Sequence, residues 1–178
     1  MSDQPSTSAS PLPPPDRFHL SSALGWLGLG NAAEAAAELN AIAPEHLGRL
    51  DVLAVKWDVS ARLKRWPECL EIADQLVEQW PCEPTGWIDR SFALHELDRT
   101  REAHDNLASV AGRFEKVWTI PYNLACYACQ LGDRDGARRW LRKAFAVEDK
   151  SRLLRIAMED PDLEPMWDEV GKIAEILE

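Results

Sequence analysis

The sequence repeats its pattern of apolar residues every 34 positions, four times in succession. One column of the repeat holds only small residues: Ala35, Cys69, Ala103 and Ala137. A second column holds only leucine: Leu29, Leu63, Leu97 and Leu131. Two further columns are apolar throughout: Leu39, Ala73, Leu107 and Leu141, and Ile42, Leu76, Val110 and Ala144. Four columns that stay in phase without an insertion predict four copies of one structural unit, stacked in a row.

Within each unit the apolar residues recur at helical spacing, and no segment after Asp16 alternates as a half-buried strand does. In the fourth unit this pattern predicts a first helix over Trp118–Leu131, a turn at Gly132-Asp133 and a second helix over Arg134–Ala146. The corresponding turns in the other units are Gly30-Asn31, Lys64-Arg65 and Asp98-Arg99. The small column lies where two helices must cross closely. The sequence therefore predicts an all-α chain of helix pairs.

This pattern resembles the tetratricopeptide repeat family, most clearly in N-L-A-C-Y-A-C-Q-L-G-D at Asn123–Asp133, followed by the small Ala137. The resemblance covers four repeats, 16–49, 50–83, 84–117 and 118–151, and implies a right-handed α-solenoid of four helix pairs. The second repeat departs from the family at its eighth position, where Trp57 replaces a small residue. It is also the one repeat with the family's closing proline, Pro81. We therefore expect the second helix pair either to open locally or to have a rotated first helix.

The two ends of the chain differ from the repeats. Residues 1–15 are rich in Ser and Pro, which predicts a disordered tail that is either a docking peptide or simply solvated. Residues 152–178 predict a C-terminal cap: a short helix capped by Ser151 and ending near Met158, a break at Pro161 and Pro165, and a last helix over Met166–Leu177. The predicted inward stripe of that last helix is Met166, Trp167, Val170, Ile173 and Ile176 or Leu177. Eight acidic residues and one lysine between positions 159 and 178 supply the polar outer side that the end of a solenoid needs.

Composition excludes several classes of partner. The net charge of −10 and the pI of about 4.9 disfavour nucleic acid and anionic membranes, both of which require clustered Lys and Arg. The first residues lack the basic and apolar regions of a signal peptide, and no apolar run approaches the length of a membrane span. Four cysteines in 178 residues do not make a disulfide scaffold. We expect a cytoplasmic protein with reduced thiols and with no nucleic-acid or membrane partner.

Cys126 and Cys129 have C-x-x-C spacing, which allows two chemical interpretations and a structural one. A structural zinc site needs four ligands, and neither Cys69 nor Cys82 forms a second pair. A redox pair lies at a helix N-terminus, where the helix dipole lowers the thiol pKa, whereas this pair is predicted in mid-helix. Helix packing is the favoured interpretation, with a thiol-active or metal-binding protein as the weaker alternative. No metal or cofactor is expected.

No other motif predicts catalysis. Residues 28–33 match G-x-G-x-x-A, but a dinucleotide site needs a strand before this motif, and these residues fall in a predicted helix and turn. None of the four histidines forms a short-range triad with a carboxylate and a nucleophile: His19, His46, His95 and His104. Asp160 and Asp162 flank Pro161 and are interpreted as turn and capping residues. The chain is therefore predicted not to be an enzyme.

A basic cluster lies on the predicted second helix of the fourth repeat. Its members are Arg134, Arg138, Arg139, Arg142 and Lys143. Like charges four positions apart repel by a few tenths of a kcal/mol unless something neutralises them. Either an acidic partner binds this helix, or the helix face is solvated and screened by the acidic C-terminal cap; the second interpretation is favoured.

The family resemblance also implies where a partner would bind, because the first helices line the concave groove in which ligand peptides usually lie. The positions concerned are Leu24, Asp58, Arg62, Ile88, Phe92, His95, Tyr122, Cys126 and Cys129. Family members that clamp a carboxylate tail place Lys, Arg and Asn in this groove, so a dicarboxylate clamp is not expected here. With Phe92 and Tyr122 as anchors, the groove suits an amphipathic helix or an extended apolar peptide.

The predicted function is a non-catalytic interaction adaptor or scaffold that binds a protein or peptide partner in this groove. The alternative is a structural module that associates with further copies of itself. The sequence does not identify the partner.

Overall fold

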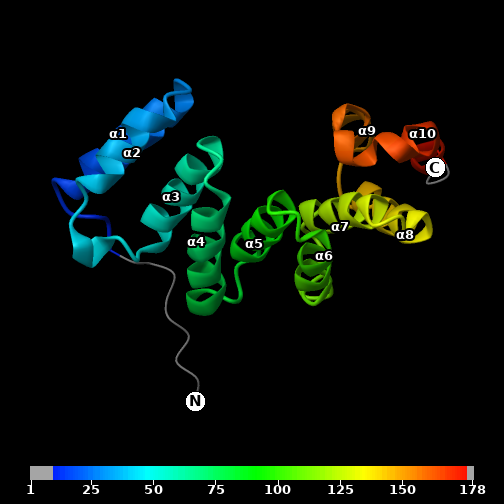
Figure 1. Ribbon diagram of the computed structural model, residues 1–178, viewed down its shortest axis with the longest axis horizontal. Coiled ribbons are helices and arrows are strands. Elements are labelled where there is room, and N and C mark those ends of the chain that lie inside the picture. Colours follow the sequence, from blue (N-terminus) through cyan, green and yellow to red (C-terminus); the bar gives the residue numbers. More distant parts are fainter. Residues whose placement is uncertain (1–9, 176–178) are drawn as a thin grey trace, which may run out of the picture. The chain divides into compact units, whose positions relative to one another are not determined.

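The computed structural model describes residues 10–175, and every regular element in that range is a helix (Figure 1). The chain divides into two compact units, Met1–Arg65 and Trp66–Glu178. The division falls between α3 (Leu50–Arg62) and α4 (Trp66–Gln79), the two helices that the period assigns to the second repeat. This is also the repeat in which Trp57 occupies a position held elsewhere by Ala or Ser.

The first unit contains α1 (Asp16–Gly28), α2 (Ala32–Asn40), a short 3-10 helix η1 (Pro44–His46) and α3. Helix α1 packs against both α2 and α3. The buried carboxylate of Asp16 ties the start of α1 to the end of this helix pair: one oxygen accepts a hydrogen bond from the Ala43 backbone N at 3.2 Å and lies 2.6 Å from His46 Nδ1. The hydrogen bond with His46 lowers the pKa of Asp16, against the opposing effect of burial.

The N-terminal tail is shorter than predicted. Residues 1–9 lie outside the described part of the chain, but residues 10–15 are packed onto the first unit. Leu12 is buried in the core of that unit, and the backbone oxygen of Ser10 accepts a hydrogen bond from Arg49 Nη2 at 3.0 Å. The predicted disordered tail therefore does not include residues 10–15, because the Leu12 side chain and the Ser10 carbonyl attach this stretch to the first unit.

The second unit continues with α5 (Pro84–Glu96), α6 (Thr100–Ala108), α7 (Thr119–Gln130) and α8 (Arg134–Phe145). Each helix from α4 to α8 packs against the next one in the sequence. The C-terminal part adds α9 (Lys150–Glu159), the 3-10 helix η2 (Pro161–Met166) and α10 (Trp167–Glu175). Here η2 lies against α7, while α10 lies against α8 and α9, as the yellow, orange and red segments of Figure 1 show.

The turns between paired helices repeat the 34-residue period in their backbone. In these turns the residues in left-handed conformation are Gly30, Lys64, Asp98 and Gly132, with φ of 76°, 55°, 61° and 79°. In each turn this residue donates its N–H to the carbonyl three positions earlier, and the following residue donates to the carbonyl five positions earlier. This pair of bonds is the Schellman motif, which satisfies the last carbonyls of a helix. The period read from side chains is thus confirmed by hydrogen bonding.

Lys64 occupies one of these positions with a side chain that disfavours it. We expect Lys64→Gly to raise the free energy of unfolding by about 0.5–1 kcal/mol, because glycine adopts positive φ without a Cβ clash. The matched opposite change, Gly132→Ala, should lower it by about 1 kcal/mol. Urea denaturation of the two variants measures both effects, and a destabilised Lys64→Gly variant would contradict the assignment.

The small column, which the sequence places at helix crossings, and the two further apolar columns are buried. The four residues of the small column have no exposed surface, and the columns that begin at Leu39 and Ile42 are at most 6% exposed. The leucine column differs, because it lies at the end of each first helix: Leu29 is 77% exposed and the other three leucines are half-buried. Small residues at the crossing are therefore a packing requirement, whereas the leucines contribute only partly to the core.

The C-terminal cap differs from its prediction in one detail. The N-cap of α9 is Asp149, whose carboxylate accepts a hydrogen bond from the Arg152 N at 2.8 Å, and not Ser151. Asp149 stands one residue before the helix, where a short acceptor side chain reaches the free N–H groups, and Ser151 is already inside it. The predicted inward stripe holds for Met166, Val170 and Ile173, which are buried. Trp167 is only half-buried, and positions 176 and 177 lie outside the described residues.

Candidate protein-binding surface

The nine predicted groove residues are divided between the two units. Leu24 on α1 is 51% exposed, and Asp58 and Arg62 on α3 are exposed. The other six belong to the second unit: Ile88, Phe92 and His95 on α5, and Tyr122, Cys126 and Cys129 on α7. Helices α5 and α7 contact each other, and the part of the two helices that carries these six residues is here called the α5–α7 face.

The α5 part of this face is open. Phe92 is 37% exposed, and its ring makes an edge-to-face contact with the ring of Trp66, with 5.8 Å between ring centroids. Ile88 is half-buried one helical turn earlier. An aromatic pair with an exposed edge offers apolar area at low cost in side-chain entropy. This end of the face is therefore available to an apolar side chain.

The α7 part is covered by the chain's own residues Asp160–Met166, here called the covering segment. Tyr122 donates its hydroxyl hydrogen to Asp160 Oδ2 at 2.6 Å, and the Cys126 thiol lies 3.6 Å from the same oxygen. Tyr122, Cys126 and Cys129 are at most 6% exposed as a result. These predicted groove residues do lie on a common face, but they contact another part of the same chain.

A second carboxylate extends the contact to α5. Asp162 Oδ2 lies 3.1 Å from His95 Nε2, and the backbone oxygen of Asp162 accepts a hydrogen bond from Gln130 Nε2 at 2.8 Å. Next along the segment, the backbone oxygen of Pro165 accepts a hydrogen bond from Arg134 Nη2 at 2.8 Å. The side chains of Leu163 and Met166 are fully buried. The covering segment is therefore held by polar contacts along its length and by two apolar side chains.

Sequence reasoning identified part of this arrangement. Asp160 does cap η2, since its Oδ1 accepts a hydrogen bond from the Asp162 N at 3.0 Å, as its interpretation as a capping residue predicted. The contacts with α7 were missed. One feature of the sequence could have indicated the contacts with α7. Asp160 lies 34 residues after Cys126, at the position equivalent to Cys126 in a further repeat.

The contact between His95 and Asp162 makes this part of the fold depend on pH. The hydrogen bond to Asp162 raises the pKa of His95 above its ordinary value of 6.5, and burial opposes this only in part. A raised folded-state pKa means that the contact stabilises the fold fully below pH 6.5 and that this contribution is lost as the pH rises through the raised pKa.

We therefore expect hydrogen exchange of residues 160–166 to show less protection relative to α8 as the pH rises from about 6 to about 9, after correction for intrinsic exchange. The loss should be greater in the wild-type chain than in His95→Gln, which keeps a polar side chain but does not titrate. Parallel pH profiles for the two chains would exclude His95 as the cause.

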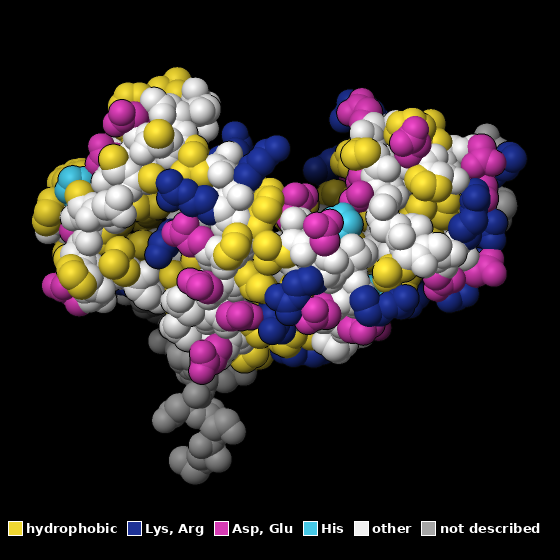
Figure 2. Space-filling view, viewed as in Figure 1, with side chains coloured by type: hydrophobic (Ala, Val, Ile, Leu, Met, Phe, Trp, Pro, Cys, Tyr) yellow, Lys and Arg dark blue, Asp and Glu magenta, His cyan; other side chains and the backbone are white. Residues whose placement is uncertain are grey.

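The basic cluster on α8 is partly neutralised within the chain. Glu169 of α10 pairs with Arg134 at 2.8 Å and also with Arg138, which pairs in addition with Asp135. Figure 2 shows Lys and Arg side chains next to Asp and Glu at the end formed by α8 and α10. Screening by the acidic cap, the favoured interpretation of this cluster, is confirmed for these two arginines.

Solved structures similar to this chain are helical-repeat proteins. TTC0263, a thermophilic TPR protein of Thermus thermophilus, matches with a TM-score of 0.68 at 18% identity, over 91% of this chain and 98% of that one. MamA matches with a TM-score of 0.67 at 13% identity, over 86% and 90%, and a point mutant of MamA matches with 0.61 at 16%, over 75% and 77%. This chain has the tetratricopeptide-repeat fold. No protein-family sequence model matches it, and no curated protein matches it in sequence.

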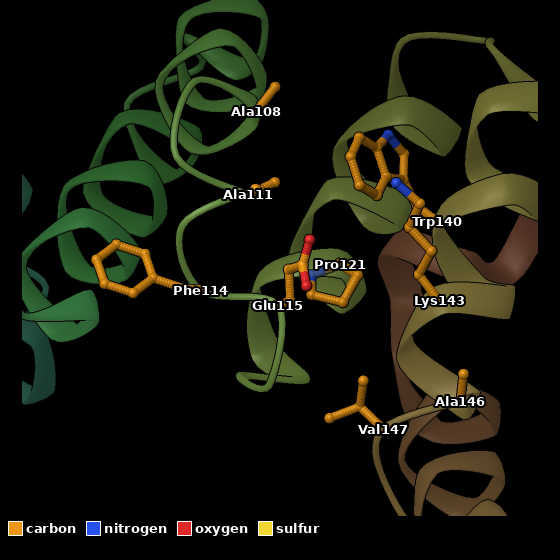
Figure 3. Close-up of a pocket in the computed structure, with 10 residues that line it drawn as sticks. Ala108, Ala111, Phe114, Glu115, Pro121, Trp140, Lys143, Ala146 and Val147 are labelled. Carbon is orange, nitrogen blue, oxygen red and sulfur yellow. The ribbon is translucent and has the colours of Figure 1, made fainter.

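Residues of α6, α7 and α8, together with residues that follow α6 and α8, form a separate pocket of about 420 Å³ (Figure 3). One side is formed by the end of α6 at Ala108 and the residues after it, and the other side by the last turns of α8. Trp140 and Lys143 project side by side from α8, with the Lys143 ammonium 4.3 Å from the indole ring, and Glu115 and Pro121 lie across from them. The pocket is mainly apolar and is lined by Ala108, Ala111, Gly112, Phe114, Glu115, Pro121, Trp140, Lys143, Ala146 and Val147.

The cysteines of the described chain are all free, and three of them are buried. Burial raises the pKa of Cys69 to about 11 and raises the pKa of Cys126 and of Cys129, with Asp160 adding to the effect at both. A raised pKa disfavours the thiolate, which is the reactive and metal-binding form. Among residues 10–175, no group of three or more His, Cys, Asp or Glu side chains is placed to hold a metal ion. Within the same range, no helix has the length and apolar character needed to span a bilayer.

We expect one thiol per native chain, that of the exposed Cys82, to react promptly with Ellman's reagent. The other three should react only as fast as the chain unfolds, because they are buried and protonated. All four should react at once in concentrated denaturant. Prompt reaction of Cys126 or Cys129, detected by mapping the labelled peptides, would restore the thiol-active interpretation.

Proposed function

We propose that this chain is a protein-interaction module that binds a segment of a partner protein on the α5–α7 face. The observation that supports this is the covering segment itself, a short stretch outside the α-helices that Tyr122, His95 and Gln130 hold through side-chain hydrogen bonds. A surface that satisfies the polar groups of such a stretch and also buries a leucine has the properties of a peptide-recognition site.

The role is binding and not catalysis. Tyr122, Cys126 and Gln130 act as hydrogen-bond donors to the covering segment, and burial raises the pKa of the two thiols of this face, Cys126 and Cys129. The open part of the face, with Phe92 and Ile88, supplies an apolar anchor site next to these donors. Leu24, Asp58 and Arg62 form the corresponding proposed surface of the first unit.

Selection of peptides from a displayed random library on the full chain tests this proposal. We expect selected peptides to lose affinity by at least about tenfold in Phe92→Ala, because an aromatic anchor in a binding site commonly contributes more than about 1.4 kcal/mol. Val147→Ala is the matched control. Val147 is 42% exposed, similar to Phe92, but it lies away from this face and lines the pocket shown in Figure 3. Peptides that bind both variants equally well would exclude this face.

A second candidate function, self-association, is favoured by one observation in the first unit. Helix α1 and its C-cap expose three large apolar residues: Phe18 at 56%, Leu24 at 51% and Leu29 at 77%. Figure 2 shows hydrophobic side chains over this part of the first unit. Light scattering of the purified chain separates the two candidates, since a monomer at high concentration would exclude association through α1, and a dimer that Leu24→Lys dissociates would support it.

A further inference from the structure

The covering segment shows which chemistry the α5–α7 face accepts. Its two carboxylates, two positions apart, each find a donor on a different helix: Asp160 on α7 through Tyr122, and Asp162 on α5 through His95. The proline between them restricts the backbone at the start of η2, and the Asp160 carboxylate also closes the turn onto the Asp162 N. The two carboxylates are therefore placed so that one reaches α7 while the other reaches α5.

The residue after the second carboxylate provides the apolar contact. Leu163 is fully buried among the core residues of the second unit, whereas its neighbour Glu164 is exposed. The pattern that contacts the face is thus two aspartates separated by one residue and followed at once by a leucine. Gln130 adds a bond to the backbone carbonyl of Asp162, which any residue in that position would offer.

The surface is complementary to this pattern in charge as well as in shape. The side chains of Tyr122, Cys126 and Gln130 on α7 and of Arg134 on α8 donate to the segment, and His95 donates through Nε2 when that nitrogen carries a proton. Helix α7 (Thr119–Gln130) contains no Asp or Glu, so this part of the face presents no carboxylate to the segment. A site made of donors favours a ligand that brings acceptors and negative charge.

We propose that the α5–α7 face is a recognition site for acidic segments of the form Asp-x-Asp-Leu, and that Asp160–Met166 is an internal occupant which a partner segment of this form displaces. This inference rests on the proposed function and specifies its ligand. It differs from the expectation of an amphipathic helix or an extended apolar peptide, because the hydroxyl of Tyr122 donates a hydrogen bond to the covering segment.

A partner segment must compete with the covering segment for the α5–α7 face, so the covering segment determines how tightly a partner has to bind. A segment tethered between α9 and α10 competes at an effective concentration of about a millimolar or more. The apparent affinity for a partner equals its affinity for the open face multiplied by the fraction of chains in which the face is free. Weakening the internal contact should therefore tighten the binding of an added peptide, which is an effect that a purely structural cap would not produce.

Fluorescence anisotropy with a labelled peptide of residues Glu159–Trp167 tests the inference on the full chain. The variant combines Asp160→Asn with Asp162→Asn, because asparagine keeps the capping acceptor but removes both charges. We expect this variant to bind the peptide at least about tenfold more tightly than the wild-type chain does. The same peptide with both aspartates replaced by asparagine should bind the variant at least about tenfold more weakly, since charged hydrogen bonds are lost.

Glu164→Gln is the matched control, because Glu164 is an exposed acid of the same segment with no contact to the face, and it should bind the peptide as the wild-type chain does. Tyr122→Phe in the double-asparagine background should weaken binding by about tenfold. Equal binding by wild-type and double-asparagine chains, or equal binding of the two peptides, overturns the inference.

Two further readouts keep the outcome unambiguous. If the double-asparagine chain does not fold, NMR of the isotopically labelled wild-type chain replaces it: excess aspartate peptide, but not the asparagine peptide, should shift the amide signals of residues 160–166. If library peptides bind through Phe92 while the aspartate peptide does not bind, this inference fails and the proposed function stands. If neither kind of peptide binds the double-asparagine chain, both fail.

Discussion

Replacing Ala35 by leucine is expected to lower the free energy of unfolding of the first unit by about 3 kcal/mol. Ala35 has no exposed surface and lies at the crossing of α1 and α2, in the small column of the repeat. Three additional carbon atoms at a close crossing push the helices apart or force strained rotamers. Urea denaturation followed by circular dichroism measures the loss.

Ala37→Leu is the matched control. It makes the same chemical change two residues later in the same helix, but Ala37 is exposed. Alanine and leucine have similar helix propensities, so this variant should stay within about 0.5 kcal/mol of the wild-type chain. If the two variants were equally stable, the small column would have no packing role and the repeat register would have to be shifted.

The repeat architecture could be predicted because it depends on contacts between residues at a constant sequence separation. A small residue at a crossing and a left-handed residue at a turn are local requirements, and each recurs after 34 residues. Two of the four left-handed positions are not glycine, yet Lys64 and Asp98 adopt the same turn. The same pair of hydrogen bonds forms in all four turns, and at Lys64 and Asp98 it does so against the local preference of the residue.

The candidate site was only half predictable. Helical periodicity placed Tyr122, Cys126 and Cys129 on one face of α7, but it could not show which segment covers that face. The covering segment contains two prolines and follows α9, so its path depends on long-range packing of Leu163 and Met166. Asp160 and Asp162 looked like turn residues because turns and ligands use the same short carboxylate side chains.

The ligand inferred for the face differs between the sequence and the structure. By residue type the predicted groove is apolar, which favours an apolar ligand. In the folded chain the tyrosine hydroxyl, the histidine ring and the Cys126 thiol all contact carboxylates of the covering segment. Residue type alone does not show whether an amphipathic side chain presents its apolar body or its polar end.

The covering segment also bears on stability, and Leu163→Ala is expected to lower the free energy of unfolding of the second unit by about 3 kcal/mol. Leu163 is fully buried, and the cavity left by truncation cannot collapse easily because hydrogen bonds on both sides hold the segment in place. Met158→Ala is the matched control, since Met158 is a large apolar residue of the preceding helix that is 42% exposed; it should cost less than about 1 kcal/mol. Tryptophan fluorescence in urea reports both variants. A loss below about 1 kcal/mol for Leu163→Ala would mean that the polar contacts alone hold the segment, and displacement by a partner would then depend on the two carboxylates and not on the leucine.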